Sequence, residues 1–282
     1  MKYLKYHALG NDYIVLSPKH FKKKPSVGAV RLICHRNYGL GSDGILYGPV
    51  DSKSGDFGLR IFNPDGSEAE KSGNGLRIFA RSLYDQGLVG EDPFTVAVPG
   101  GVVSCRVESG GGIVTVQMGE VSFHSSIIPV TGLPREVLNE DIRLGEKIFK
   151  FSAATVGNPH CIVFTDKPSA EETKRFGPQI EKDPRFPNRT NVQFVKVIDR
   201  ENIQIEIWER GAGYTLASGS SSTAAAAVAN RLELGGPKIT VHMPGGDLSV
   251  RFSDGFLASL TGPVTKICEG TMMEEMFGKT PI

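Results

Sequence analysis

Two serines stand in glycine-flanked turns that lead into apolar segments of the chain. Ser72-Gly73-Asn74-Gly75 precedes a helical pattern that closes at Gly87, and Ser218-Gly219-Ser220 precedes the alanine-rich segment 223–229. The second segment is apolar nearly all round, which predicts a buried helix. The first N–H groups of a helix lack an intrahelical acceptor and carry the positive end of its dipole. Each turn is therefore suited to hold a carboxylate or a phosphate.

The two turns occupy matching places in an internal repeat. Gly10-Asn11 lies upstream of the first turn, and Gly157-Asn158 lies upstream of the second. Downstream, Pro99-Gly100-Gly101 is matched by Pro244-Gly245-Gly246. Asn, Ser and Pro-Gly-Gly recur in the same order at an offset of 145 to 147 residues. The repeat predicts two copies of one domain, with one site approached from both sides.

Short apolar runs bounded by glycine and proline turns predict strands around each of the two helices. One long helix among many strands occurs twice, which predicts an α+β (α/β) fold. We expect two pseudo-symmetric domains, each a curled, mostly antiparallel sheet around a central helix. The predicted domains span residues 1–118 and 119–266, with the tail 267–282 packing back on the first.

The composition favours a soluble protein with a small-molecule partner. A net charge of +1 over 282 residues, with no long basic run, gives no support for nucleic acid as a partner. No apolar run has the length of a signal peptide or a membrane span, so we expect a cytoplasmic protein without membrane contact. Four scattered cysteines without Cys-x-x-Cys spacing predict reduced thiols rather than disulfides or a metal site. The sequence does not fix the oligomeric state, and a homodimer is compatible with it.

Polar side chains recur at equivalent points around the two turns. Asn63 stands nine residues before Ser72, and Glu209 stands nine before Ser218, with Arg210 beside it. Arginine can hold a carboxylate through two parallel hydrogen bonds, and asparagine can serve both an ammonium and a carboxylate. His160 and Glu209 are the candidates for proton transfer. An amino acid fits this set, although a plain turn residue is an equally good interpretation of each asparagine.

Five segments of the chain resemble the signature segments of diaminopimelate epimerase. They are His7-Ala8-Leu9-Gly10-Asn11-Asp12, Asn63-Pro64-Asp65-Gly66-Ser67, Gly73-Asn74-Gly75-Leu76-Arg77, Gly157-Asn158-Pro159-His160 and Trp208-Glu209-Arg210-Gly211. The resemblance implies two pseudo-symmetric domains with the site in the cleft between them. It also implies inversion of an amino acid Cα by two bases on opposite faces, without pyridoxal phosphate, another cofactor or a metal. The substrate that it implies is diaminopimelate, converted from the LL to the meso form for lysine and peptidoglycan synthesis.

The resemblance also implies roles for individual residues. The two bases fall at Ser72 and Ser218, with His160 and Glu209 tuning them. The implied substrate-binding residues are Asn11, Asn63, Gly73, Asn74, Asn158, Asn191, Arg210, Gly219 and Ser220.

The departures from the family are at reactive positions. Ser72 and Ser218 stand where the family has cysteines, and an alcohol is a far weaker acid than a thiol of pKa near 8.5. Gly44 replaces a usual glutamine, and Tyr214 replaces a usual glutamate. The chain is then a natural branch with altered chemistry, an epimerase whose cysteines were replaced by design, or a non-catalytic relative. The changes at Gly44 and Tyr214 favour natural divergence.

The sequence thus predicts an amino acid epimerase or racemase whose activity is weakened or modified by the serines. A hydroxy-amino-acid dehydratase on the same scaffold is the second interpretation. An amino-acid-binding protein without turnover is the third. The donors suit many dipolar amino acids, so the substrate stays open.

Overall fold

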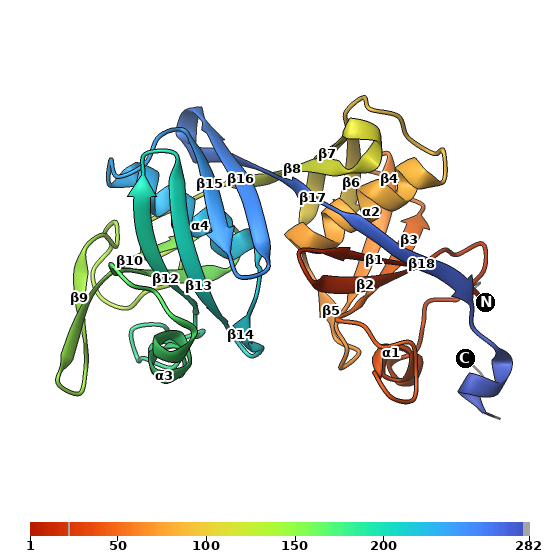
Figure 1. Ribbon diagram of the computed structural model, residues 1–282, viewed down its shortest axis with the longest axis horizontal. Helices are drawn as coiled ribbons and strands as arrows, with labels where there is room; N and C mark the ends of the chain where they lie inside the picture. Colours follow the sequence, from red (N-terminus) through yellow and green to blue (C-terminus); the bar gives the residue numbers. More distant parts are fainter. Residues whose placement is uncertain (22, 279–282) are drawn as a thin grey trace. The chain divides into compact units, whose positions relative to one another are not determined.

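The computed structural model describes residues 1–21 and 23–278 (Figure 1). The chain forms two compact units: unit 1 comprises Met1–Val116 and the chain from Gly262 onward, and unit 2 comprises Gln117–Thr261. The predicted return to the first domain, at residue 267, lies five residues after the one in the structure. The chain leaves unit 1 along β8 (Ile113–Glu120) and returns along β17 (Leu257–Pro263).

Unit 1 is built on a mixed sheet. Its other strands are β1 (Lys2–Ala8), β2 (Asn11–Leu16), β3 (Ile45–Val50), β4 (Phe57–Phe62), β5 (Glu68–Ala69), β6 (Phe94–Val98), β7 (Gly101–Glu108) and β18 (Thr265–Thr271). The hydrogen-bonded order is β18-β1-β2-β3-β4-β6-β7-β8, with β5 paired to β4. The β2–β3 and β4–β6 pairs are parallel and the others antiparallel.

Unit 2 repeats this plan strand for strand. Its other strands are β9 (Glu140–Leu144), β10 (Lys147–Thr155), β11 (Pro159–Phe164), β12 (Asn191–Asp199), β13 (Asn202–Glu209), β14 (Gly213–Thr215), β15 (Lys238–Met243) and β16 (Gly246–Ser253). The order is β9-β10-β11-β12-β13-β15-β16-β17, with β14 on β13. The parallel pairs, β11–β12 and β13–β15, occur at the places that correspond to those in unit 1. The predicted α+β fold of two pseudo-symmetric domains is confirmed.

Each unit has a central helix, as predicted: α2 (Gly73–Asp85) in unit 1 and α4 (Gly219–Arg231) in unit 2 (Figure 1). The α2 helix packs on β1, β2 and β7, and Gly87 follows its end with φ of 67°. That left-handed conformation favours glycine and ends the helix, as the sequence indicates. The buried alanines of α4 are small enough for the helix to lie close against the strands that surround it.

The expectation of one long helix in each half is incomplete. Unit 2 also contains α3 (Ala170–Glu181), and unit 1 contains α1 (Val27–Cys34), which follows the helical spacing of apolar residues over 26–34 in the sequence. The sequence of α3 has few apolar residues and contains Pro178, so it does not have a strong apolar pattern. Its few apolar side chains, Phe176 and Ile180 among them, are buried in the core beside Phe151 and Phe194. Tertiary packing, rather than a local sequence pattern, therefore stabilises this segment as a helix.

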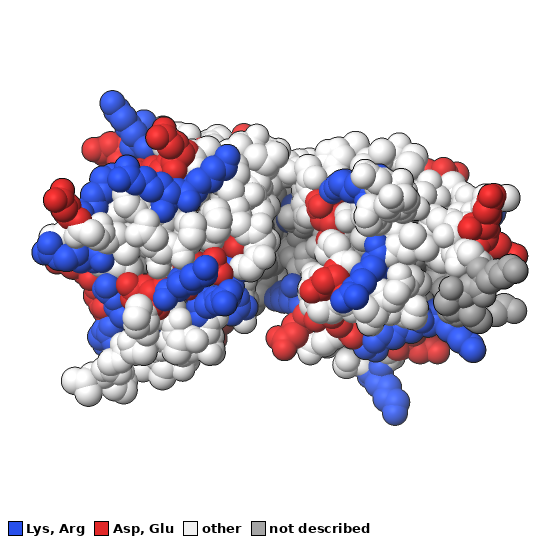
Figure 2. Space-filling model, turned by 90° about the horizontal axis from the view of Figure 1, so that it is seen from below, with Lys and Arg blue, Asp and Glu red and all other residues white. Residues whose placement is uncertain are grey.

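The surface carries charges of both signs. On the face drawn in Figure 2, basic and acidic side chains are intermixed, without a continuous stripe of one sign. Within residues 1–21 and 23–278, no helix has the length and apolar character that a membrane span requires. The expectation that nucleic acid is not a partner stays a prediction.

Candidate active site

In unit 1, Ser72 is the N-cap of α2. Its hydroxyl accepts a hydrogen bond from the Gly75 N–H at 3.0 Å, and the first intrahelical bond joins Leu76 N–H to the Ser72 carbonyl. The N–H groups of Gly73 and Asn74 precede that first bond, so they have no acceptor inside the helix. Ser72 therefore lies beside the anion-attracting end of a buried helix.

A chain of amide hydrogen bonds joins Asn74 to Asn11. Arg77 Nη2 donates to Asn74 Oδ1 at 2.8 Å, and Asn74 Nδ2 donates to Asn11 Oδ1 at 3.0 Å. Asn11 Nδ2 in turn donates to Asp43 Oδ2 at 3.0 Å. Because each amide oxygen already accepts a bond, the orientation of both amides is fixed. The structure thus brings together Asn11, Ser72, Gly73 and Asn74, which we call the unit 1 cluster.

Tyr13 contacts this cluster from β2. No pattern in the sequence marks it as a site residue. Its hydroxyl lies 3.4 Å from Ser72 Oγ. A Cβ at Gly44 would lie 2.6 Å from Tyr13 Cε1 and 2.7 Å from the Phe62 carbonyl oxygen. The Tyr13 ring therefore occupies the space that a side chain at position 44 requires. This packing requires a residue without a side chain at position 44.

Asn63 lies apart from the unit 1 cluster in the turn between β4 and β5. Its Nδ2 donates to Ser67 Oγ at 2.9 Å, and its N–H donates to the Ser67 carbonyl at 2.8 Å. Within the part of the chain that the structure describes, Asn63 forms no hydrogen bond with Asn11 or Ser72. The observed role of Asn63 is that of a turn residue, and substrate contact stays a prediction.

In unit 2, Ser218 is the N-cap of α4 and is almost fully buried. Unlike Ser72, its hydroxyl does not cap the helix. It interacts instead with the carboxylate of Glu209, whose Oε1 also accepts from Thr215 Oγ1 at 2.8 Å. Burial raises the pKa of Glu209, and the two hydroxyls partly oppose that rise. The arrangement gives Ser218 a neighbouring group that can accept its proton.

His160 is fully buried between two amide side chains. Its Nε2 lies 3.0 Å from Asn158 Oδ1, and Asn158 Nδ2 donates to Ser220 Oγ at 3.4 Å. Gln193 interacts with the imidazole from β12 and donates to Ser221 Oγ at 3.0 Å. Burial lowers the pKa of His160 to about 3, and the charge of Arg210 acts in the same direction. The ring is therefore neutral at physiological pH.

Asn191 and Glu181 hold the segment that carries Glu209 and Arg210. Asn191 Oδ1 accepts from the Arg210 N–H at 2.9 Å, and its Nδ2 donates to the Pro159 carbonyl at 2.9 Å. Glu181, buried at the end of α3, accepts from Trp208 Nε1 at 2.7 Å and from the Gly211 N–H at 3.2 Å. The guanidinium of Arg210 is exposed and donates to the Asn188 carbonyl at 2.9 Å. Backbone anchoring thus leaves the Arg210 side chain accessible from solvent.

The residues that cluster in unit 2 lie in or directly next to β11, β12, β13 and the start of α4. We call them the unit 2 cluster: Asn158, His160, Asn191, Glu209, Arg210, Ser218, Gly219 and Ser220. Tyr214 lies next to this cluster in β14, and its hydroxyl donates to the buried Glu206 at 2.6 Å. Burial and Glu206 raise the pKa of Tyr214 to about 12, so it is a neutral donor.

Sequence reasoning missed several supporting residues. They are Tyr13, Arg77, Glu181, Gln193 and Thr215. Arg77 lies inside one of the signature segments, and its charge on an apolar helix was an available signal. The others lie on strands or on α3, where no local pattern sets them apart.

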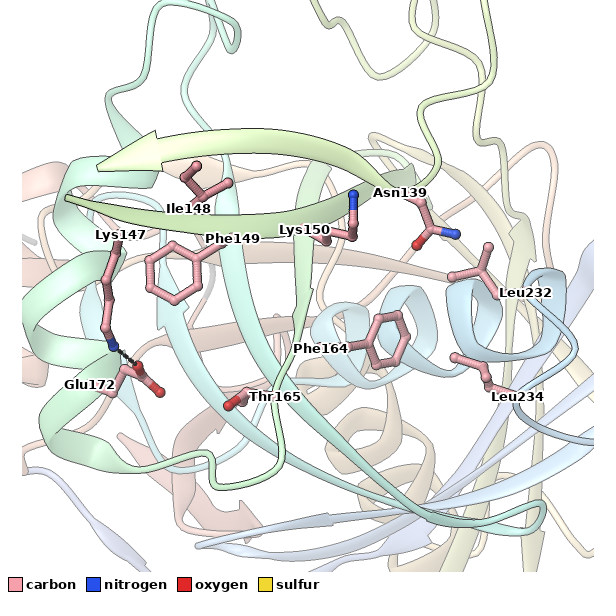
Figure 3. A pocket seen from close by; sticks show the side chains of 10 residues that line it. All are labelled: Asn139, Lys147, Ile148, Phe149, Lys150, Phe164, Thr165, Glu172, Leu232 and Leu234. Carbon is pink, nitrogen blue, oxygen red and sulfur yellow. Dashed lines mark hydrogen bonds and ion pairs between the residues drawn. The ribbon is translucent and has the colours of Figure 1, made fainter. Parts of the chain in front are cut away.

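A cavity of about 700 Å³ in unit 2 is not lined by any predicted site residue (Figure 3). Its Lys147 binds Glu172 at 2.8 Å, and its Lys150 binds Asp141 at 2.9 Å. Both lysines are thus neutralised, and this cavity has no evident function. Among the described residues, no three His, Cys, Asp or Glu side chains gather as metal ligands.

The fold is that of a two-domain α+β protein, and it is shared with the phenazine biosynthesis protein PhzF family. The structure of that family's member from Bacillus anthracis matches with a TM-score of 0.69 at 15% identity, covering 97% of this chain and 99% of the other. The sequence profile of diaminopimelate epimerase matches residues 3–124 and 152–267.

Two relatives named as diaminopimelate epimerases are similar to this chain over nearly their whole length. Diaminopimelate epimerase 2 of Nostoc sp. is 57% identical, covering 98% of this chain and 97% of its own. Diaminopimelate epimerase of Desulfitobacterium hafniense is 37% identical, covering 98% and 99%. The chain belongs to the diaminopimelate epimerase family, a family of isomerases.

Proposed function

We propose that this protein inverts the Cα of diaminopimelate between the LL and meso forms, without a cofactor. The observation that carries the proposal is the pair of serines at the N-caps of α2 and α4, in a chain 57% identical to a protein named diaminopimelate epimerase 2. Both serines lie next to helix N–H groups that have no intrahelical acceptor, as a two-sided site for a carboxylate requires.

In this proposal, the unit 1 and unit 2 clusters both supply groups that bind the amino acid. The carboxylate at the reacting centre accepts hydrogen bonds from the N–H groups of Gly73, Asn74, Gly219 and Ser220. Asn158 and Arg210 hold the distal end, with the exposed guanidinium binding the second carboxylate through two parallel bonds. Asn63 contributes to that end, Asn191 positions Arg210 through its backbone, and Asn11 closes the site.

The serines need help to move protons, because an alkoxide is costly to form. Ser218 can accept the Cα proton while its own proton passes to Glu209, so that it need not carry a full charge. The Ser72 hydroxyl then delivers its proton to the opposite face of Cα, and solvent restores the starting protonation states. His160, neutral because of burial, orients Asn158 rather than carrying a proton.

Solvent exchange tests this function. LL-diaminopimelate incubated with the protein in D₂O should gain deuterium at Cα and yield the meso form, as followed by NMR and chiral chromatography. Ser218→Ala should abolish both, because proton transfer on one face is lost. Loss of water from a hydroxy-amino acid would identify a dehydratase instead, and binding of diaminopimelate without exchange would identify a binding protein.

Restoring thiols tests the role of the serines. Ser72→Cys combined with Ser218→Cys should raise Cα exchange, because a thiol ionises near neutral pH at a helix N-terminus. Each tenfold gain corresponds to about 1.4 kcal/mol of barrier, and either single change should give less. A folded double variant that binds diaminopimelate without any added exchange would refute the epimerase assignment.

A further inference from the structure

Arg77 is a buried cation at the start of α2 that nothing in the described residues neutralises. Its side chain is fully buried. Its Nη1 donates to the Gly73 carbonyl at 3.3 Å, and its Nη2 donates to Asn74 Oδ1 at 2.8 Å. Its Nε has no hydrogen-bond partner within residues 1–21 and 23–278, and no carboxylate there pairs with it. The guanidinium thus folds back along α2 onto Gly73 and Asn74 of its first turn.

A buried charge without a counter-ion is costly, so its presence calls for an explanation. Burial lowers the pKa of Arg77 to about 10, which still leaves the group charged at neutral pH. Its charge adds to the positive end of the α2 dipole. An anion beside the first turn would lower the energy of this arrangement.

The repeat supplies an internal comparison. Thr223 lies five residues after Ser218, as Arg77 lies five after Ser72. Thr223 Oγ1 donates to the Gly219 carbonyl at 2.8 Å, the same bond to the first helical carbonyl that Arg77 makes. The two helix starts thus match at this bond, for which unit 1 uses a cation and unit 2 a neutral hydroxyl. Unit 2 has Glu209 beside its serine instead.

We propose that Arg77 is a positioning residue that makes the α2 N-terminus the anion-holding half of the site, with an oxyanion at Ser72 Oγ as its partner. This inference rests on the proposed function for its catalytic meaning. When Ser72 gives its proton to Cα, the O–H bond breaks and the negative charge stays on Oγ. Arg77 and the helix dipole stabilise that charge. On the other face, Ser218 passes its proton to Glu209, so the two serines have different tasks.

Other titratable groups also lie around Ser72. Tyr13 faces Ser72 from β2, with its hydroxyl 3.4 Å from Ser72 Oγ. Asp12 and Asp43 both accept from Arg36, at 3.0 and 2.7 Å. Burial raises the pKa of Asp12, but hydrogen bonds from Lys5 and Arg36 outweigh it and lower the pKa overall.

Three further groups belong to the same surroundings. Lys71 precedes Ser72, and burial lowers its pKa, with the buried Cys105 of β7 interacting with it. From β1, the Tyr6 hydroxyl donates to Asp85 at the opposite end of α2, at 2.8 Å. Lys71 is therefore the cation that the experiment must separate from Arg77.

The pKa of an introduced thiol measures the inference without requiring catalysis. Ser72→Cys and Ser218→Cys are made separately with Cys268→Ser, because Cys268 is the exposed native cysteine within the described residues. Thiolate absorbance against pH gives each pKa. The thiol introduced at position 72 should titrate about one pKa unit or more below the one at position 218, because a cation lies beside it and an acid lies beside the other.

Variants of Arg77 identify the source of that difference. Arg77→Met should raise the pKa of the thiol at 72 by about one unit, and Arg77→Lys should retain much of the lowered value. Thr223→Val is the matched change in unit 2 and should leave the thiol at 218 unshifted. Circular dichroism identifies any variant that fails to fold, and the comparison between the two thiols does not depend on an Arg77 variant.

Equal pKa values for the two thiols would overturn the inference. So would a shift from Lys71→Met as large as that from Arg77→Met, which would assign the effect to Lys71. A low thiol pKa at position 72 without any Cα exchange would uphold the anion site and refute the proposed function. Exchange with equal thiol pKa values would uphold the function and refute the role of Arg77.

Discussion

Glu181→Gln should destabilise unit 2, because Glu181 anchors the strand end that carries Glu209 and Arg210. The carboxylate is only 4% exposed and accepts from Trp208 Nε1 at 2.7 Å and from the Gly211 N–H at 3.2 Å. A hydrogen bond to a charged group contributes about 1.5 kcal/mol or more. Glutamine removes the charge from both bonds and turns one acceptor into a donor. Glu181 is the last residue of α3, where a negative charge interacts unfavourably with the helix dipole. Removing that charge offsets the loss of stability by up to about 1 kcal/mol.

The free energy of unfolding should therefore fall by about 2 kcal/mol. Trp208 is the single tryptophan of the chain, so its fluorescence during urea unfolding reports on unit 2 at this bond. Glu201→Gln is the matched control, because Glu201 is an exposed glutamate of the same unit and should change stability by less than about 0.5 kcal/mol. Equal urea midpoints for the two variants would refute the anchoring role.

Three further results are expected. Arg210→Lys should weaken diaminopimelate binding by calorimetry despite the retained charge, because the planar fork that holds a carboxylate is lost; unchanged affinity would remove Arg210 from the site. Since burial lowers the pKa of His160 to about 3, the unfolded state binds the extra proton between pH 6.5 and 3, so stability is lost as pH falls through that range. His160→Gln should remove up to about 1.4 kcal/mol per pH unit of that slope in chemical denaturation, and an identical slope in both proteins would contradict the buried neutral state. Gly44→Ala should lower the free energy of unfolding by about 1–3 kcal/mol in thermal or urea unfolding. The added Cβ would lie 2.7 Å from the rigid Phe62 carbonyl oxygen and 2.6 Å from Tyr13. An unchanged free energy of unfolding would show that the strand shifts freely.

The sequence by itself determined the repeated architecture and the starts of both central helices. The glycine and serine residues of Ser72–Gly75 and Ser218–Ser220 act locally, through backbone freedom and, at Ser72, through side-chain capping, so their spacing carries the information directly. The end of α2 before Gly87 follows from the same kind of local rule. Strand positions were also readable, because short apolar runs between turns need no knowledge of their partners.

Only the tertiary structure decided which side chains support the two serines. Tyr13 reaches Ser72 across 59 positions of sequence, and Glu181 reaches Trp208 across 27. Such contacts depend on strand order and register, which no local pattern specifies. The same reason explains α3, whose helical pattern is weak and whose Phe176 is placed by the core.

The difference between the two serines also belongs to tertiary structure. At the level of sequence, Ser72 and Ser218 are equivalent members of a repeat. In the folded chain, Ser72 caps its helix beside the buried charge of Arg77, whereas Ser218 is turned to Glu209. The sequence specifies which residue types are present. Burial from water and the orientation of a side chain arise only when the chain folds, and they give the two serines different surroundings.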